Sequence, residues 1–441
     1  MSESTNAPRD ALTIVYLPPA ELTPYVHNAR THPKQQLAQI EASIRAHGFV
    51  NPILIDEDGV VIAGHGRLIA AKALGLTEVP TIRLQGLSEA QRRQLRIADN
   101  KIALNSEWDL DLLKLELEAL SAPGLSFDLD SLGFSVGELD TLLAPAKASA
   151  EDVVPPTPKH AITELGDLWI LGLHRIGCGD CRDESFLRQV VGRGMVDAAF
   201  ADPPYNIRLG GNAVAKGRHR EFAMAVGEMS RADFTGFLAE ALGAAARVSK
   251  PGAVHFVCMD HHHLAELLDA GDAVYGRRLN ICVWNKSNGG MGALYRSKHE
   301  LVGVFVVGDT PHFNAVELGR HGRNRTNVWD YPSVNTLKGS RRHDLALHPT
   351  VKPISLVADA IQDVTRRDER VLDSFLGSGT TLLAAERVGR RCVGIELDPL
   401  YVDLALGRWS SLTGREPVLE ATGQTWAQVR EARRSETPLC A

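Results

Sequence analysis

The hydrophobic pattern of the first hundred or so residues predicts a small mixed domain. Leu37, Ile40 and Ile44 recur at helical spacing and indicate an amphipathic helix. Asp58-Gly59 separates two short apolar runs and favours a hairpin turn. The elements predicted here are strands at 13–17, 52–55 and 60–63 and helices at 34–47, 68–74, 87–104 and 110–120.

Strands and helices alternate beyond residue 160, which is typical of a mainly parallel sheet with helices on its faces. The strands predicted there are 168–171 and 174–178, which form a hairpin, and then 195–201, 253–257, 280–284, 301–307, 370–373 and 392–396. The helices predicted there are 184–191, 232–248, 354–364, 382–388 and 398–408. The segment 308–347 has few periodic apolar residues and is too long for an ordinary loop, so we expect an insertion with a function of its own.

Length and composition predict two main domains and their connections. A chain of 441 residues exceeds one ordinary core, and prolines cluster shortly before the alternating region begins. The predicted organisation is an N-terminal domain at 10–104, a helical extension at 105–143, a Pro/Ala-rich linker at 144–160, an α/β domain at 161–414 and a peripheral tail at 415–441.

Charge is unevenly distributed along the chain. The net charge is −6, but the segment from Lys286 to Asp344 holds nine Lys or Arg and five acids, a local excess of +4 that leaves −10 for the remainder. Such a basic segment is typical of a localised phosphate-binding surface, and a solvated face without a partner is the alternative. No apolar run approaches the ~20 residues of a membrane helix, and the polar N-terminus lacks a signal-like core, so a cytoplasmic protein is expected.

Neither the cysteines nor the histidines form a recognisable metal pattern. Cys178 and Cys181 make one CxxC among six cysteines, without a second Cys or His pair at zinc spacing, so two reduced thiols are predicted. The three histidines at 261–263 follow Asp260 without partner ligands and are interpreted as solvated. No metal is therefore expected.

A carboxylate, a proline carbonyl and an aromatic ring stand together after the predicted strand 195–201. They belong to Asp202-Pro203-Pro204-Tyr205. Ligands of open α/β sheets bind outside the carboxyl ends of the strands, so this tetrapeptide is placed to contact one. Hydrogen-bond acceptors beside an aromatic face suit an amine that is held for nucleophilic attack.

A second group of residues predicts a site for an adenosine-containing ligand. Gly377 and Gly379 follow a predicted strand and permit a tight turn that approaches a ligand closely, although an ordinary turn is the alternative. Glu396 ends the next strand, 17 residues after Gly379, where a carboxylate can accept both hydroxyls of a ribose. Thr380-Thr381 stands where a Rossmann phosphate signature has its third glycine. This favours S-adenosylmethionine, which has no pyrophosphate.

The motifs resemble those of the β group of DNA amino-methyltransferases, with Asp202-Pro203-Pro204-Tyr205 preceding Phe375-Leu376-Gly377-Ser378-Gly379 in the chain. The supporting motifs are Gly166-Asp167-Leu168, Cys178-Gly179-Asp180-Cys181, Tyr295-Arg296 with His299-Glu300, Asn327-Val328-Trp329 and His348-Pro349-Thr350-Val351-Lys352-Pro353. The similarity covers about 165–413. It implies an α/β fold with a Rossmann-like sheet that binds S-adenosylmethionine as methyl donor.

The resemblance also implies a role for each site residue. Asp202 and the carbonyl of Pro203 would accept hydrogen bonds from the exocyclic amine of a flipped base, Pro204 completes the motif, and Tyr205 would stack on the base. The residues implied to bind S-adenosylmethionine are Asp180 at the adenine, Glu396 at the ribose, Asp373, Phe375, Gly377 and Gly379 at the methionine part, Lys352 at the carboxylate, and Thr380 as a further candidate.

The N-terminal domain resembles the ParB/sulfiredoxin-like family. The similar motifs are Asn51-Pro52-Ile53, Gly64-His65-Gly66-Arg67-Leu68, Ala70-Ala71 and Val79-Pro80. In that family the glycine-rich turn contacts phosphates. The resemblance implies a separate α+β domain whose partner is a nucleotide or a protein. His65 and Gly66 stand where an acidic and a second basic residue are common, so nucleotide hydrolysis is not expected. The turn has no cysteine, which excludes a sulfiredoxin.

These features predict a site-specific DNA methyltransferase that acts on N6 of a flipped adenine in duplex DNA, of bacterial, phage or plasmid origin. Asp202 at the first motif position favours adenine, whereas no cysteine follows a proline as methylation at cytosine carbon 5 would require. The base-reading surface is predicted at 208–227 and 308–347. The alternatives are a cytosine-N4 enzyme, a methyltransferase of RNA or of a protein amine, and a ParB-like DNA-binding regulatory or partition protein whose methyltransferase domain is inactive. A homodimer is a further candidate state.

Overall fold

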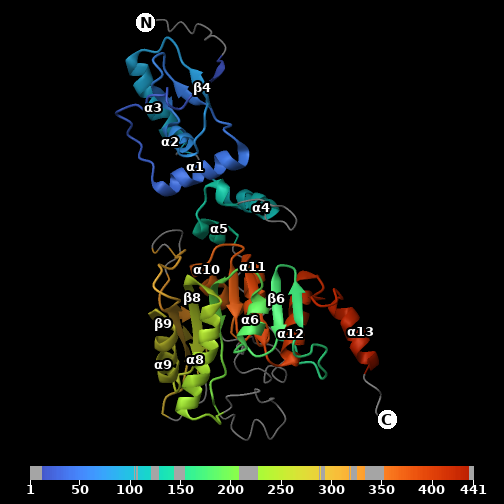
Figure 1. Cartoon of the computed structure of the whole chain (residues 1–441). Coiled ribbons are helices and arrows are strands. Elements are labelled where there is room, and N and C mark those ends of the chain that lie inside the picture. The colour runs from blue at the N-terminus through green and yellow to red at the C-terminus, as the bar shows by residue number, and fades with distance from the viewer. Residues whose placement is uncertain are drawn as a thin grey trace. The chain divides into compact units, whose positions relative to one another are not determined.

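The chain folds into two compact units, Met1–Leu143 and Ala144–Ala441 (Figure 1). The computed structural model describes residues 12–103, 105, 108–120, 129–143, 154–207, 227–287, 289, 294–316, 318, 325–332 and 352–436. Most of the predicted linker and most of both predicted base-reading segments lie outside these residues.

A four-stranded sheet of order β1-β4-β2-β3 forms the first unit. Its strands are β1 (Ile14–Leu17), β2 (Ile53–Ile55), β3 (Val61–Ala63) and β4 (Val79–Arg83). The helices are α1 (Lys34–His47), α2 (His65–Ala73), α3 (Glu89–Ala103), α4 (Leu110–Leu120) and α5 (Val136–Leu142), with a 3-10 turn at Leu129–Leu132. Ile53, Val61, Leu68 and Val79 join in a buried core. The predicted α1 and the antiparallel pair β2/β3 are confirmed.

Two elements of this unit differ from the prediction. β4 was not predicted, because Pro80 interrupts its short apolar run; in the structure Pro80 lies opposite Tyr16 in the antiparallel pair with β1. α2 begins at His65 rather than at residue 68, since Gly64 ends the preceding strand segment in the left-handed conformation, with φ of 103°.

The second unit contains a ten-stranded sheet of order β11-β9-β10-β8-β7-β12-β13-β6-β5-β14. Its strands are β5 (Leu168–Leu171), β6 (His174–Cys178), β7 (Val196–Ala201), β8 (Ser249–Met259), β9 (Arg277–Asn285), β10 (His299–Val306), β11 (Val328–Asp330), β12 (Arg370–Asp373), β13 (Arg391–Glu396) and β14 (Val418–Leu419). The central strands β8, β7, β12, β13 and β6 are parallel, whereas β10 and β5 pair antiparallel with their neighbours. The predicted mainly parallel sheet is therefore correct for the centre, and the predicted hairpin is confirmed as the antiparallel pair β5/β6.

Helices cover both faces of this sheet (Figure 1). They are α6 (Glu184–Val191), α8 (Arg231–Arg247), α9 (Leu264–Val274), α10 (Ile354–Val364), α11 (Thr380–Val388), α12 (Pro399–Thr413) and α13 (Trp426–Glu436). Side chains alternate between faces along a strand. Val371 of β12 accordingly packs with α10, α11 and α12, and the next residue, Leu372, packs with α6 and α8. The sheet thus has the three-layer architecture predicted from the alternating pattern.

The two segments at the ends of this sheet differ from the prediction. The predicted insertion contributes β11, which pairs in parallel with β9 and buries Trp329. The residues after Gly414, predicted to be a peripheral tail, add β14 beside β5 and then α13. Arg433 of α13 binds Asp167 through two hydrogen bonds, at 2.5 and 3.0 Å. A two-residue strand and a polar helix give too weak a periodic signal for this docking to be predicted.

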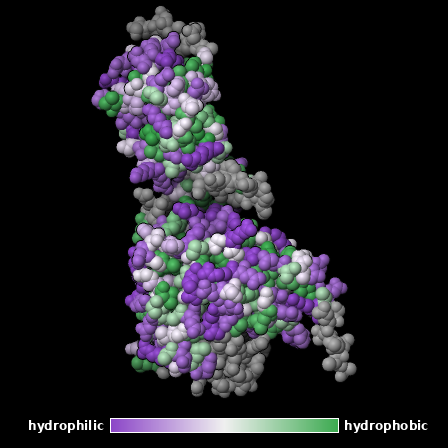
Figure 2. Space-filling view, viewed as in Figure 1, coloured by the Kyte–Doolittle hydropathy of each residue, from purple (hydrophilic) through white to green (hydrophobic). Residues whose placement is uncertain are grey.

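The visible surface of the second unit over α6 and α8 is largely hydrophilic, with apolar residues scattered among polar ones (Figure 2). The helices of the described residues include none with the length and apolar character needed to cross a membrane. Cys178 and Cys181 are buried free thiols, as the sequence predicts.

Candidate functional site

The motif residues gather at one edge of the ten-stranded sheet. Asp202 follows β7, Asp373 ends β12 and Glu396 ends β13, and these three strands are parallel neighbours. Strand β10 runs in the opposite direction, so its first residues, including Glu300, lie at the same edge. The carboxyl ends of the central strands therefore bring residues far apart in the sequence into one region.

Both carboxylate oxygens of Asp202 have partners. Lys352 Nζ lies 2.6 Å from Oδ2, and the hydroxyl of Tyr205 donates to Oδ1 at 2.7 Å. Lys352 also donates to the Tyr205 oxygen at 3.1 Å. Asp202 keeps 26% of its side chain exposed, whereas Lys352 keeps only 4%. The carboxylate is thus the outer member of a mostly buried polar cluster.

Glu300 is the second carboxylate of this cluster and was not predicted as a site residue. Its Oε2 lies 2.9 Å from Lys352 Nζ, and its Oε1 accepts from Lys286. The sequence feature that could have indicated Glu300 is an acidic residue directly before the apolar residues of β10. The contact itself depends on the antiparallel register of β9, β10 and β8, which the sequence did not reveal.

The charges of the cluster stabilise one another. Burial raises the pKa of Asp202, and the nearby Lys352 offsets part of this effect. Burial alone would lower the pKa of Lys352, but Asp202 and Glu300 outweigh it and raise this pKa above its usual value. Burial would likewise raise the pKa of Glu300, yet Lys352 and Lys286 lower it overall. Lys352 and Glu300 are therefore charged at neutral pH.

The glycine turn is held by backbone geometry and by one buried arginine. Gly377 and Gly379 have φ of 51° and 84°, and a Cβ added to Gly379 would lie 2.8 Å from the Cβ of Ala405. Arg408 of α12, 5% exposed, donates to the carbonyl of Ser378 at 2.7 Å. Arg408 was not predicted, because a lone arginine in an apolar helix carries no motif.

Glu396 receives backbone donors on both oxygens. The amide of Gly377 donates to Oε2 at 2.8 Å, and the amide of Asp398 donates to Oε1 at 2.9 Å. Each carboxylate oxygen can accept further hydrogen bonds, so the pair of oxygens fits the two hydroxyls of a ribose. The Glu396 carboxylate therefore offers the acceptors that the ribose of the predicted adenosine-containing ligand would need.

Asp373 and the residues around it form the next part of this edge. Phe375 donates its amide to Oδ1 of Asp373 at 3.0 Å, and the Thr381 side chain also hydrogen-bonds the carboxylate. Burial raises the pKa of Asp373 to about 7. A partly protonated acid there can gain a full charge when a cation binds, which suits the ammonium of a methionine group. Thr380 begins α11 and supplies no side-chain cap.

Two residues implied to contact the cofactor have other partners in the structure. Arg182 makes a bidentate contact with the Asp180 carboxylate, with Nη2 2.7 Å from Oδ2 and Nε 3.1 Å from Oδ1. An adenine that contacts the Asp180 carboxylate would therefore compete with Arg182. Lys352, implied to hold the cofactor carboxylate, is instead paired with Asp202 and Glu300.

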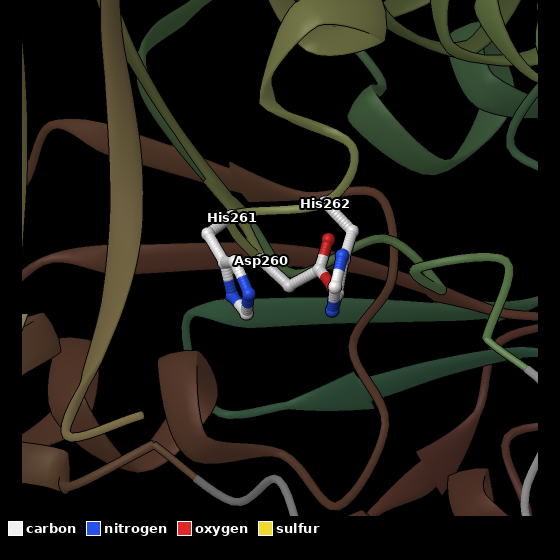
Figure 3. A group of neighbouring side chains, drawn as sticks. All are labelled: Asp260, His261 and His262. Carbon is white, nitrogen blue, oxygen red and sulfur yellow. The ribbon is translucent and has the colours of Figure 1, made fainter. Parts of the chain in front are cut away.

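Asp260, His261 and His262 form a separate group at the end of β8 (Figure 3). Their ligand atoms lie within 4.8 Å of one another, a spacing that a metal ion could bridge. Oδ1 of Asp260, however, already accepts from the amide of His263 at 3.0 Å. Solvated histidines remain the interpretation of this group.

Comparison with known proteins supports both halves of the chain. A model described as DNA methylase matches residues 196–407, and models of the ParB N-terminal domain and the ParB-methyltransferase HTH domain match 3–101 and 111–165. The segment predicted as a plain helical extension at 105–143 thus lies largely within a helix-turn-helix match that continues through the predicted linker.

Individual relatives match each half. The ParB-like nuclease domain-containing protein YnaK of Escherichia coli is 52% identical over 85 residues, which are 19% of this chain and 98% of YnaK. Type II methyltransferase M2.MboI of Moraxella bovis is 26% identical over 240 residues, 51% of this chain and 83% of its own. Among solved structures, PvuII DNA methyltransferase, cytosine-N4-specific, has 14% identity and a TM-score of 0.42, covering 63% of this chain and 95% of its own.

The residues matched by the DNA methylase model include β7 with the Asp202 motif, the glycine turn and Glu396. The first unit belongs to the same family as YnaK. The chain is therefore an S-adenosylmethionine-dependent DNA methyltransferase of the N6/N4 amino type that carries an N-terminal ParB-like domain.

Proposed function

We propose that the enzyme methylates N6 of a flipped adenine in duplex DNA and that Asp202 accepts hydrogen bonds from the target amine. The observation that carries this proposal is the Asp202 carboxylate, partly exposed at the end of β7 and two strands from Glu396. The aspartate at the first motif position favours adenine over cytosine, as the family resemblance implies.

The chemistry requires an acceptor at this position. The amine of a nucleobase is conjugated and weakly nucleophilic, and accepting its hydrogens directs the nitrogen lone pair outward. The sulfonium of S-adenosylmethionine supplies the methyl group: a nitrogen–carbon bond forms as the carbon–sulfur bond breaks, and the electron pair stays on sulfur. The nitrogen becomes positive and then releases one proton to water. Asp202 stabilises the charge that develops on the nitrogen.

The remaining residues are proposed for binding the methyl donor. Glu396 would accept the ribose hydroxyls, and Asp373 would bind the ammonium of the methionine part. Gly377 and Gly379 would allow the turn to approach the ligand. Asp180 would meet the adenine after Arg182 shifts. Pro203 would add its carbonyl as a second acceptor for the target amine, and Pro204 would hold the backbone of the motif in an extended conformation.

Tyr205 is proposed to stack on the target base. In the structure its hydroxyl donates to Asp202, which holds the ring beside the proposed acceptor of the target amine. The helix-turn-helix match and the ParB-like domain are proposed to increase DNA affinity. We also propose that the enzyme acts in the cytoplasm, where its DNA lies.

Transfer of labelled methyl groups tests this function. The protein is incubated with labelled S-adenosylmethionine and unmethylated plasmid DNA, and the DNA is digested to nucleosides. Label in N6-methyladenine is the expected result. Label in N4-methylcytosine would contradict adenine specificity while keeping the enzyme class. Absence of label with DNA binding intact would favour a ParB-like regulatory protein, and label in RNA or protein but not in DNA would exclude a DNA substrate.

A further inference from the structure

Lys352 bridges two carboxylates, one of which has no role in the proposed function. Its Nζ lies 2.6 Å from Asp202 Oδ2 and 2.9 Å from Glu300 Oε2. We propose that Glu300 is a positioning residue. It keeps the Lys352 ammonium in place when Asp202 releases Lys352 and accepts a hydrogen bond from the target amine. This inference rests on the proposed role of Asp202 as acceptor.

Asp202 already binds two donors, and a target amine adds a third. Its Oδ2 faces Lys352, and its Oδ1 accepts from Tyr205. A target amine that donates to this carboxylate must displace or share one of these donors. If Lys352 had Asp202 as its sole carboxylate partner, displacement would leave a buried ammonium without a counter-ion, which is strongly unfavourable. Glu300, only 8% exposed, supplies the second counter-ion at hydrogen-bond distance.

Lys286 keeps Glu300 in place for this exchange. It donates to Oε1 of Glu300, while Lys352 approaches Oε2. The two oxygens therefore hold two ammonium groups, one from the segment after β9 and one from the segment before α10. The cluster contains two carboxylates and two ammonium groups, so its charges balance. They stay balanced when a neutral amine binds to Asp202.

Seven titratable groups of the described residues belong to this cluster or face it. They are Asp202 and Tyr205 after β7, Cys258 on β8, Lys286 after β9, Glu300 on β10, Lys352 before α10 and Asp373 on β12. Burial raises the pKa of Tyr205 and of Cys258 well above their usual values, so both stay neutral. The negative charge of Glu300 raises the pKa of Asp202. Removing that charge must lower the pKa of Asp202.

Glu300→Gln separates the positioning role from a merely structural one. An amide cannot neutralise the two ammonium groups, so Lys352 should stay on Asp202 and compete with the amine. We expect the plateau of single-turnover transfer, at saturating S-adenosylmethionine and plasmid DNA, to fall by about tenfold or more. The acid limb of the pH profile should move to lower pH. A folding defect would lower the rate without moving this limb.

Three further variants complete the test. Glu300→Asp keeps the charge, so it should restore the wild-type position of the acid limb and part of the rate. In a Lys352→Met background, Glu300→Gln should cause no further loss, because Glu300 acts through Lys352. Glu386→Gln is the matched control: this carboxylate is 25% exposed and pairs with His174 and Arg415, outside the cluster, and its loss should leave the limb in place.

The outcomes distinguish this inference from the function on which it rests. A wild-type plateau for Glu300→Gln, an unmoved limb, a full additional loss in the Lys352→Met background, or a Glu300→Asp variant no better than Glu300→Gln would overturn the role of Glu300. An active Asp202→Ala variant, measured in parallel, would overturn the proposed role of Asp202 instead. Thermal unfolding and binding of S-adenosylhomocysteine check that each variant is folded.

Discussion

The two halves of the site are built from different interactions. On the donor side, Glu396 is held by the backbone amides of Gly377 and Asp398. On the amine side, Asp202 is bound by the side chains of Lys352 and Tyr205. Backbone amides fix the Glu396 carboxylate in the fold, whereas the side chains that bind Asp202 can move when a ligand arrives. We therefore expect the proposed cofactor half to be preformed at Glu396, and the proposed amine half to exchange partners at Asp202 when the target arrives.

The largest effect expected on the preformed half is that of a methyl group in the glycine turn. Gly379→Ala combines a left-handed φ of 84° with a Cβ 2.8 Å from that of Ala405, and it should lower the free energy of unfolding by about 3 kcal/mol. Gly414→Ala is the matched control, because its φ is 69° but nothing lies within 4 Å, so about 1 kcal/mol is expected. Urea unfolding measures both, and equal losses would show that the turn is not tightly packed.

Loss of charge at Glu396 tests whether this half alone binds the cofactor. Glu396→Gln should weaken S-adenosylhomocysteine about tenfold to thirtyfold, because hydrogen bonds to a charged acceptor are stronger than those to an amide. Calorimetry measures the affinity, and Glu420→Gln, an exposed acid paired with Arg175, serves as control. Unchanged binding in Glu396→Gln would remove the ribose role of this residue.

The smallest expected effect is the pH dependence of cofactor binding. The pKa of Asp373 is raised to about 7, and only its ionised form attracts the cofactor ammonium. Affinity should therefore rise with pH, by about fivefold between pH 6 and pH 7, while an α-amino group stays mostly protonated. The same titration with Asp373→Asn should be weaker and flat. A pH-independent wild-type affinity would contradict this assignment.

The sequence carries clearer local signals for Glu396 and Gly377, on the proposed cofactor side, than for the contact between Lys352 and Glu300 on the amine side. Glu396 ends one predicted strand and Gly377 follows another, so the rule that ligands bind at the carboxyl ends of strands placed both near Asp202. Glu300 lies at the start of an antiparallel strand, and its contact with Lys352 depends on strand register, which no local pattern encodes. Lys352 was predicted to hold the carboxylate of the cofactor, but its partners in the structure are the carboxylates of Asp202 and Glu300.

The strands of the large sheet also differ in how strongly the local sequence indicates them. The parallel centre was predicted because buried strands and intervening helices leave strong local signals. The edge strands β11 and β14 were not predicted, since they are three and two residues long and depend on pairing with β9 and β5. Short strands gain stability from their neighbours rather than from their own sequence.

The role of Asp202 as acceptor is tested by the effect of Asp202→Asn on two quantities measured in parallel. The amide keeps the shape of the side chain but removes the charge that faces the target amine. We predict that S-adenosylhomocysteine affinity stays within about threefold of the wild type, while single-turnover methyl transfer slows about a hundredfold or more. A wild-type transfer rate in Asp202→Asn would contradict the central claim that this carboxylate holds the amine.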